Sequence, residues 1–179
     1  INAWPGKADL LDNLLELNKG PDGTQYYLPI QYVVLYLYYR TDIFAAAGLK
    51  PPATCEDFRD AAIKLTKAPD VYGFGLRGGK GGWDQWGAFV FSQGGALKPG
   101  GLTNPQAVAA HQWVIDLFRQ DKVIPPSAPN DGFQEIIGAF KAGKNAMTIH
   151  HIGPSTDHRA APGGQGVAVA GAEAVAGGR

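Results

Sequence analysis

The stretch between Leu28 and Thr54 most strongly constrains how this chain folds, because its residue pattern changes twice over a short distance. A run of β-branched and aromatic residues up to Tyr39 is typical of a strand. The apolar segment after Asp42 is short enough for a single helix, and Gly48 is a favoured stop. Thr54 then stands where an N-cap residue is favoured, ahead of a second helical pattern. The stretch therefore predicts strand, helix, turn and helix, in that order.

The rest of the chain alternates helical and strand patterns, which predicts an α/β lobe, layered around a partly parallel sheet. Asp57, three positions after Thr54, completes a capping-box pattern. Asn104 and Pro105 are favoured at the N-cap and first position of a helix, so they predict the start of the longest one. We expect helices over residues 9–17, 42–47, 55–65, 83–93, 105–121 and 132–142, and strands over 25–39, 71–76, 146–150 and 166–170.

Composition excludes several classes of partner. The 179 residues carry 16 basic and 16 acidic side chains, without a block of like charge, so nucleic acid and anionic membrane are not expected partners. No apolar run approaches the ~20 residues of a transmembrane helix, so direct membrane insertion is not expected either. Cys55 is the single cysteine, which excludes an intrachain disulfide. We read it as structural.

Two glycine-rich motifs match phosphate-binding loops only in their letters. Residues 73–78 read G-x-G-x-x-G, but the motif lies on the predicted strand itself, and no acid follows ~20 residues later to bind a ribose. In the loop around Lys80, Gly81 stands where a phosphate loop needs Ser or Thr for the metal. We therefore expect no nucleotide or other cofactor, and interpret residues 78–82 as a flexible loop.

The order and spacing of several short motifs closely resemble those of extracellular solute-binding proteins of sugar ABC transporters (family 1 type). The resemblance covers about Tyr26 to Ser155, with Arg40-Thr41 in place of Asn-Lys and Cys55 in place of Trp. The motifs are Leu28-Pro29, Tyr38–Phe44, Ala47-Gly48-Leu49, Pro51–Thr54, Tyr72–Gly75, Gly94-Gly95, Asn104–Val108, Val123–Pro126 and Phe140–Ile149.

The resemblance implies a type II periplasmic-binding-protein-like lobe, since these proteins have two α/β lobes around a cleft and about twice this length. We expect a central fragment. Residues 1–25 would be a remnant of the N-terminal lobe or a linker, and 26–159 mostly the C-terminal lobe. Residues 160–179 would be an Ala/Gly-rich tail or the start of a crossover back to the N-terminal lobe. The full-length protein would be extracytoplasmic, either periplasmic or a cell-surface lipoprotein.

By the same resemblance, the protein is the carbohydrate-binding component of an ABC importer. It would capture a mono- or oligosaccharide by closure of two lobes and deliver it to the permease subunits in the membrane, without catalysis. The alternative from another class is a carbohydrate-active enzyme domain, which needs two carboxylates at a defined separation. Nothing in the sequence marks such a pair. A bare interaction module is a third reading and predicts no response to sugar.

Candidate ligand-binding residues are Trp83, Asp84, Trp86, His151 and Tyr32. Sugars stack their C–H faces on aromatic rings, while carboxylates accept from their hydroxyls, so the Trp83-Asp84 pair beside a glycine loop fits this chemistry. The alternative for both tryptophans is packing inside a helix. His150 and His151 are adjacent on a predicted strand and point to opposite faces, which argues against a metal site. The resemblance places Tyr32 near the lobe junction and His151 at a cleft edge.

Overall fold

The computed structural model describes residues 4–30 and 33–151, and the backbone of 167–171. It divides into two compact units, Ile1–Val34 and Leu35–Arg179. The first unit contains a 3-10 helix, η1 (Pro5–Asp9), and a short helix, α1 (Asp12–Leu17). A turn at Gly23 follows, where φ is +77°. Leu15 and Gln25 are the buried side chains among the described residues of this unit.

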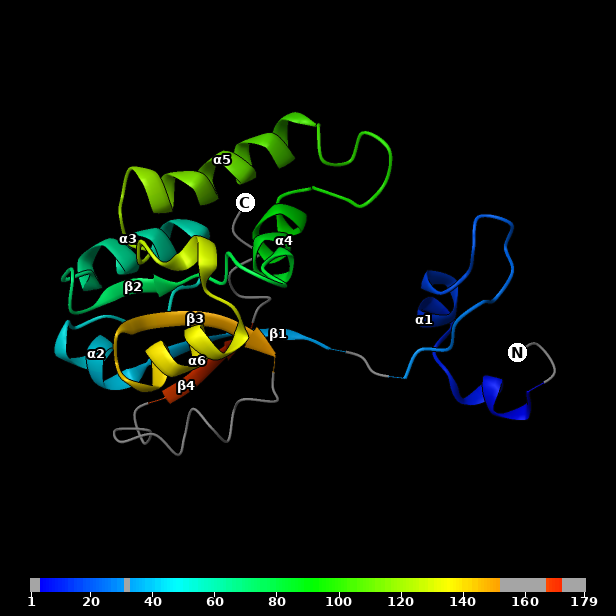
Figure 1. Ribbon diagram of the computed structural model, residues 1–179, viewed down its shortest axis with the longest axis horizontal. Coiled ribbons are helices and arrows are strands. Elements are labelled where there is room, and N and C mark those ends of the chain that lie inside the picture. Colours follow the sequence, from blue (N-terminus) through cyan, green and yellow to red (C-terminus); the bar gives the residue numbers. More distant parts are fainter. Residues whose placement is uncertain (1–3, 31–32, 152–166, 172–179) are drawn as a thin grey trace. The chain divides into compact units, whose positions relative to one another are not determined.

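The second unit is an α/β layered fold, as the alternating patterns predict. Its helices are α2 (Thr41–Ala46), α3 (Cys55–Leu65), α4 (Trp83–Ser92), α5 (Pro105–Arg119), the 3-10 turn η2 (Ala128–Asn130) and α6 (Phe133–Lys141). Its strands are β1 (Leu35–Arg40), β2 (Tyr72–Gly75), β3 (Asn145–His151) and β4 (Val167–Gly171). Figure 1 shows α3, α4 and α5 gathered on the side of the sheet where β2 lies.

The sheet is mixed, with the strand order β2-β3-β1-β4. β2 and β3 run parallel, and Phe74 lies opposite Met147 in their register. β1 pairs antiparallel with both β3 and β4. Parallel neighbours need a long crossover, and α4, α5 and α6 supply it here. The expected partly parallel sheet is therefore confirmed, and its one parallel pair places the ends of β2 and β3 at the same edge.

The core lies between the sheet and the helices α2 to α5. Its centre is a cluster of aromatic rings in edge contact, with the Phe58 and Phe74 centroids 5.0 Å apart and those of Phe74 and Phe89 6.0 Å apart. β3 is buried along its length except at His151, as expected for a strand inside a mixed sheet. α6 packs on β2 and β3 and buries Ile136, Ile137 and Phe140.

The helix starts follow the local signals in the sequence. Thr54 Oγ1 accepts from the Asp57 amide at 3.0 Å, and the Asp57 carboxylate accepts from the Thr54 amide at 3.1 Å. This reciprocal capping box satisfies amides that would otherwise lack partners at the start of α3. The Asn104 side chain accepts from the Ala107 amide at 2.8 Å in the same way, with Pro105 at the first position of α5.

Two expectations about backbone structure differ from the observed fold. Among the described residues, the predicted strand over 25–39 forms from Leu35 onward, because its ladder partners on β3 and β4 lie opposite residues 35–40. The loop 78–82 is not a free loop. The Gly78 and Gly79 amides donate to the carbonyls of Ala128 and Asp131, each at 2.9 Å. Of the helices in the described residues, none is long and apolar enough to cross a membrane.

Candidate functional site

The parallel pair β2 and β3 brings several predicted site residues to one edge of the sheet. β3 ends at His151, and α4 begins at Trp83 after the loop that follows β2. In open α/β sheets, ligands bind beyond the carboxyl ends of the strands. Figure 1 shows the end of β3 and helix α4 at the same end of the sheet. We call the residues at this edge the carboxyl rim: Arg77, Trp83, Asp84, Phe133 and His151.

Gln85 joins α4 to β3 and to the segment that follows β2. Its side chain is 1% exposed. The side-chain oxygen accepts from the Arg77 amide at 2.8 Å, and the side-chain nitrogen donates to the Ile149 carbonyl. This buried side-chain amide hydrogen-bonds to the backbone of two neighbouring segments. Breaking either bond would leave a buried polar group unpaired, so the two bonds hold α4 in place against these segments. Gln85 therefore fixes where α4 starts relative to the sheet.

Asp84 lies beside the side chain of Arg77. Arg77 Nη1 and Asp84 Oδ2 are 3.5 Å apart, and the two side chains are 17% and 30% exposed. Asp84 also accepts from the Gln85 amide through Oδ1 at 2.8 Å. The Asp84 Oδ2 atom therefore faces the guanidinium, and the carboxylate is partly exposed to solvent. Sequence reasoning selected Asp84 but missed Arg77, although an arginine directly after a strand and among glycines was a usable signal.

Phe133 connects Arg77 to the histidines at the end of β3. The Arg77 guanidinium carbon lies 5.8 Å from the centroid of the Phe133 ring, within cation–π range. That ring contacts His150 edge-on with centroids 4.6 Å apart, and the tilted ring of His151 at 5.8 Å. Phe133 is the first residue of α6. Contacts through Arg77 and Phe133 thus bring Asp84 and His151, far apart in sequence, into one cluster.

The histidines at this edge differ in burial. His150 is 4% exposed, and its Nδ1 accepts from the His151 amide at 2.9 Å, whereas His151 is half-buried. Within the described residues there is no group of three or more His, Cys, Asp or Glu side chains that could hold a metal ion. Aromatic surface and a carboxylate beside a guanidinium are what this rim offers to a ligand.

The glycine loop encloses the Arg77 side chain. Arg77 Nε donates to the Lys80 carbonyl at 2.8 Å. Gly81 has a φ of +83°, and a Cβ there would lie 2.2 Å from Arg77 Nη2. A Cβ on Gly82 would lie 2.1 Å from the Arg77 carbonyl oxygen. Gly81 and Gly82 therefore allow close packing around an arginine, and this packing explains them without phosphate binding.

The two tryptophans of α4 occupy different environments. Trp83 is 67% exposed at the first position of the helix. Trp86 is half-buried, donates its indole N–H to His111 Nδ1 at 2.7 Å and meets the Phe91 ring edge-on at 5.9 Å. Trp86 therefore packs between α4 and α5, whereas Trp83 presents an open ring face. Tyr32, the remaining candidate, lies outside the described residues.

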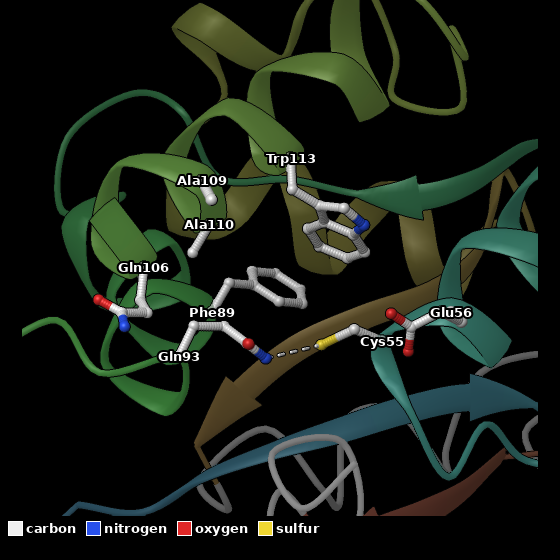
Figure 2. Close-up of a pocket in the computed structure, with 8 residues that line it drawn as sticks. All are labelled: Cys55, Glu56, Phe89, Gln93, Gln106, Ala109, Ala110 and Trp113. Atoms are coloured by element: carbon white, nitrogen blue, oxygen red, sulfur yellow. Dashed lines mark hydrogen bonds between the residues drawn. The ribbon is translucent and has the colours of Figure 1, made fainter. Parts of the chain in front are cut away.

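A separate hollow lies among α3, α4 and α5 (Figure 2). It has a volume of about 280 Å³ and is lined by Cys55, Glu56, Phe89, Gln93, Gln106, Ala109, Ala110 and Trp113. The Gln93 side chain donates to Cys55 Sγ at 3.6 Å. Burial, with the nearby Glu56 carboxylate as a smaller cause, raises the pKa of the Cys55 thiol. The neutral thiol that results agrees with a structural cysteine.

Comparison with known proteins establishes the family. A family model described as "Bacterial extracellular solute-binding protein" matches residues 1–176, nearly the whole chain. The chain belongs to the bacterial extracellular solute-binding proteins. The mannitol-binding protein of Pseudomonas aeruginosa (strain PAO1) is 31% identical over 140 residues, which are 71% of this chain and 31% of that protein. The chain thus spans about a third of the length of the curated relatives it matches.

Solved structures of this solute-binding family have the same fold. An ABC transporter solute-binding protein from Thermotoga lettingae, with bound α-D-tagatose, matches with a TM-score of 0.78 and 25% identity. The match covers 94% of this chain and 46% of that one. Maltose-bound MalE3 of T. maritima also has a TM-score of 0.78, at 23% identity, with 92% and 44% covered. The expected type II periplasmic-binding-protein-like fold is thereby confirmed.

Proposed function

We propose that this solute-binding protein captures a neutral carbohydrate or polyol between two lobes and delivers it to an ABC permease. The chain would contribute one lobe of a longer protein, with the carboxyl rim as its half of the ligand site. The observation that carries the proposal is the cluster in which Arg77 lies beside Asp84 and Phe133, and Phe133 contacts His151 at the end of β3. Trp83 precedes Asp84 at the start of α4. The relatives that bind mannitol and tagatose support the ligand class.

Each rim residue has a role that follows from its surroundings. The exposed ring of Trp83 stacks on the C–H face of a sugar, and Asp84 accepts hydrogen bonds from hydroxyls. His151 offers a half-buried ring that contacts Phe133. Trp86 supports the start of α4 through its hydrogen bond to His111. Tyr32, which lies outside the described residues, would be a further ligand contact.

Binding without catalysis is part of the proposal. A glycosidase needs two carboxylates about 5–10 Å apart around the scissile bond. Among the described residues, the carboxyl rim contains one carboxylate, Asp84, and it lies beside Arg77. That arrangement supports recognition of hydroxyls and gives no support to the alternative of a carbohydrate-active enzyme domain. Closure of two lobes around the ligand would supply the signal that the permease recognises.

Titration calorimetry on the longer protein that carries this chain tests the proposal. D-mannitol, D-tagatose and maltose serve as probes, with L-leucine as a control solute of another class. We expect a dissociation constant in the micromolar range or below for at least one probe and no heat with leucine. Chromatography of maltose after prolonged incubation should recover it intact. Maltose cleavage would support the enzyme alternative, and no binding to any of the three probes would overturn the proposal.

A further inference from the structure

Arg77 differs from the other arginines that form ion pairs in the described residues. Arg40 contacts Asp42 through two nitrogens at 2.9 and 2.6 Å, and Arg59 contacts Asp121 at 2.7 and 2.8 Å. Both are forked pairs, in which two guanidinium nitrogens donate to one carboxylate. Arg77 approaches Asp84 through one nitrogen only, at 3.5 Å, beyond the usual hydrogen-bond range. The Arg77–Asp84 pair therefore leaves hydrogen-bonding capacity on both partners.

The Arg77 guanidinium is nevertheless fixed in place. Its Nε donates to the Lys80 carbonyl at 2.8 Å, and the guanidinium carbon lies over the Phe133 ring. Because Gly81 has no side chain, Nη2 can lie close to its backbone. An arginine carries five N–H donors. Nε donates to the Lys80 carbonyl, whereas Nη2 has no acceptor within the described part of the chain. A fixed guanidinium with open donors, set beside a carboxylate at the edge of a sheet, is suited to bind an oxygen-rich ligand.

We propose that Arg77 is a ligand-binding and specificity-determining residue that shares one ligand hydroxyl with Asp84. The hydroxyl oxygen accepts from the Arg77 Nη groups, and its proton is donated to the Asp84 carboxylate. Because the Asp84 carboxylate repels a ligand carboxylate or phosphate and so offsets its attraction to the Arg77 guanidinium, the pair gives an anionic ligand no net advantage and favours a neutral polyol or sugar. The inference rests on the proposed function and adds a residue and a selectivity to it.

Calorimetry on the longer protein separates this role from a structural one. Arg77→Lys keeps the charge and removes the fork. Arg59→Lys makes the same change in the forked pair of α3 and serves as the matched control. We expect Arg77→Lys to weaken binding of D-mannitol or D-tagatose, whichever binds tighter, at least tenfold. Arg59→Lys should stay within about twofold of wild type. Thermal melts record whether both variants fold.

Monodeoxy analogues of that ligand identify the shared hydroxyl. One analogue should bind wild type at least tenfold more weakly than the parent, and Arg77→Lys should bind parent and analogue within about twofold. Asp84→Asn, which keeps Arg77 in place, should lose discrimination at the same hydroxyl. The inference is overturned if wild type binds and Arg77→Lys binds equally well. It is also overturned if either variant weakens parent and analogues by one common factor. If the wild-type protein binds neither D-mannitol nor D-tagatose, both this inference and the proposed binding of polyols and ketoses are wrong.

Discussion

Arg40 and Asp42 form a forked ion pair at the joint between β1 and α2, at the point where the sequence departs from the family motif. Arg40 is 8% exposed and also reaches the Phe140 carbonyl at 3.5 Å, so it ties β1 to the end of α6. The hydrogen bonds from Arg40 lower the pKa of the Asp42 carboxyl below its ordinary value of 3.8. Arg40 thus makes contacts within the fold and lies outside the carboxyl rim.

This pair predicts a pH dependence with a defined sign. A carboxyl whose folded-state pKa is depressed stabilises the fold above its unfolded pKa, and that contribution is lost as pH falls through the folded value. Asp42→Asn should therefore lower the free energy of unfolding by a constant amount from pH 7 to about pH 5, and by progressively less below about pH 4. Urea denaturation of both proteins at several pH values measures it. A difference that is the same at pH 3 and pH 7 would contradict this assignment.

Cys55 predicts a chemical reactivity. Because burial raises the pKa of its thiol, and Glu56 adds to the effect, little thiolate is present at pH 8. Its reaction with Ellman's reagent should be slower than that of free cysteine and should accelerate as the pH rises. Glu56→Gln should speed the reaction, because it removes the nearby negative charge. A rate equal to that of free cysteine, with no effect of Glu56→Gln, would disprove this account of the hollow in Figure 2.

At the scale of elements, local signals predicted helices better than strands. The starts of α3 and α5 were correct because a cap satisfies amides within the same few residues, as Thr54 and Asn104 do. The strand over 25–39 was too long because a strand needs partners that lie elsewhere in the chain. The loop 78–82 was read as flexible because its partners, Ala128 and Asp131, come from a distant turn.

The loop 78–82 offers a test of the packing around Arg77. Gly81 and Gly100 both have positive φ, +83° and +74°, but only at Gly81 would a Cβ meet another side chain, Arg77. Alanine at either position strains the backbone by about 1–2 kcal/mol. Gly81→Ala should also displace Arg77 and so weaken ligand binding, which Gly100→Ala should not. Melts and calorimetry on both variants measure this. Equal effects of the two on affinity would show that Arg77 is not held by the loop.

At the scale of the whole molecule, the sequence predicted the family, the α/β fold and the mixed sheet correctly. It indicated Trp83, Asp84 and His151 as separate candidates, and could not show that Arg77 and Phe133 link Asp84 to His151, because those contacts depend on the parallel register of β2 and β3. The assignment of residues 1–25, 26–159 and 160–179 to two lobes remains a prediction. So do the ligand contacts of all five candidate residues.

A one-lobe site predicts weak binding by the 179-residue chain alone. A ligand held on one side leaves hydroxyls facing water and loses about half of its contact area, while the cost of immobilising it remains. We expect this chain to bind the ligand of the longer protein at least a hundredfold more weakly. Calorimetry on both proteins under the same conditions tests this. Equal affinities would show that the described lobe carries the complete site.

The affinity of Trp83→Ala in the longer protein is the most direct test of the carboxyl rim as the ligand site. Trp83 is 67% exposed, so its removal should leave the melting temperature nearly unchanged while weakening carbohydrate binding by about 1–3 kcal/mol. Trp86→Ala should do the reverse and mainly lower stability, because Trp86 packs on Phe91 and hydrogen-bonds His111. Unchanged affinity in a folded Trp83→Ala protein would contradict the proposed site.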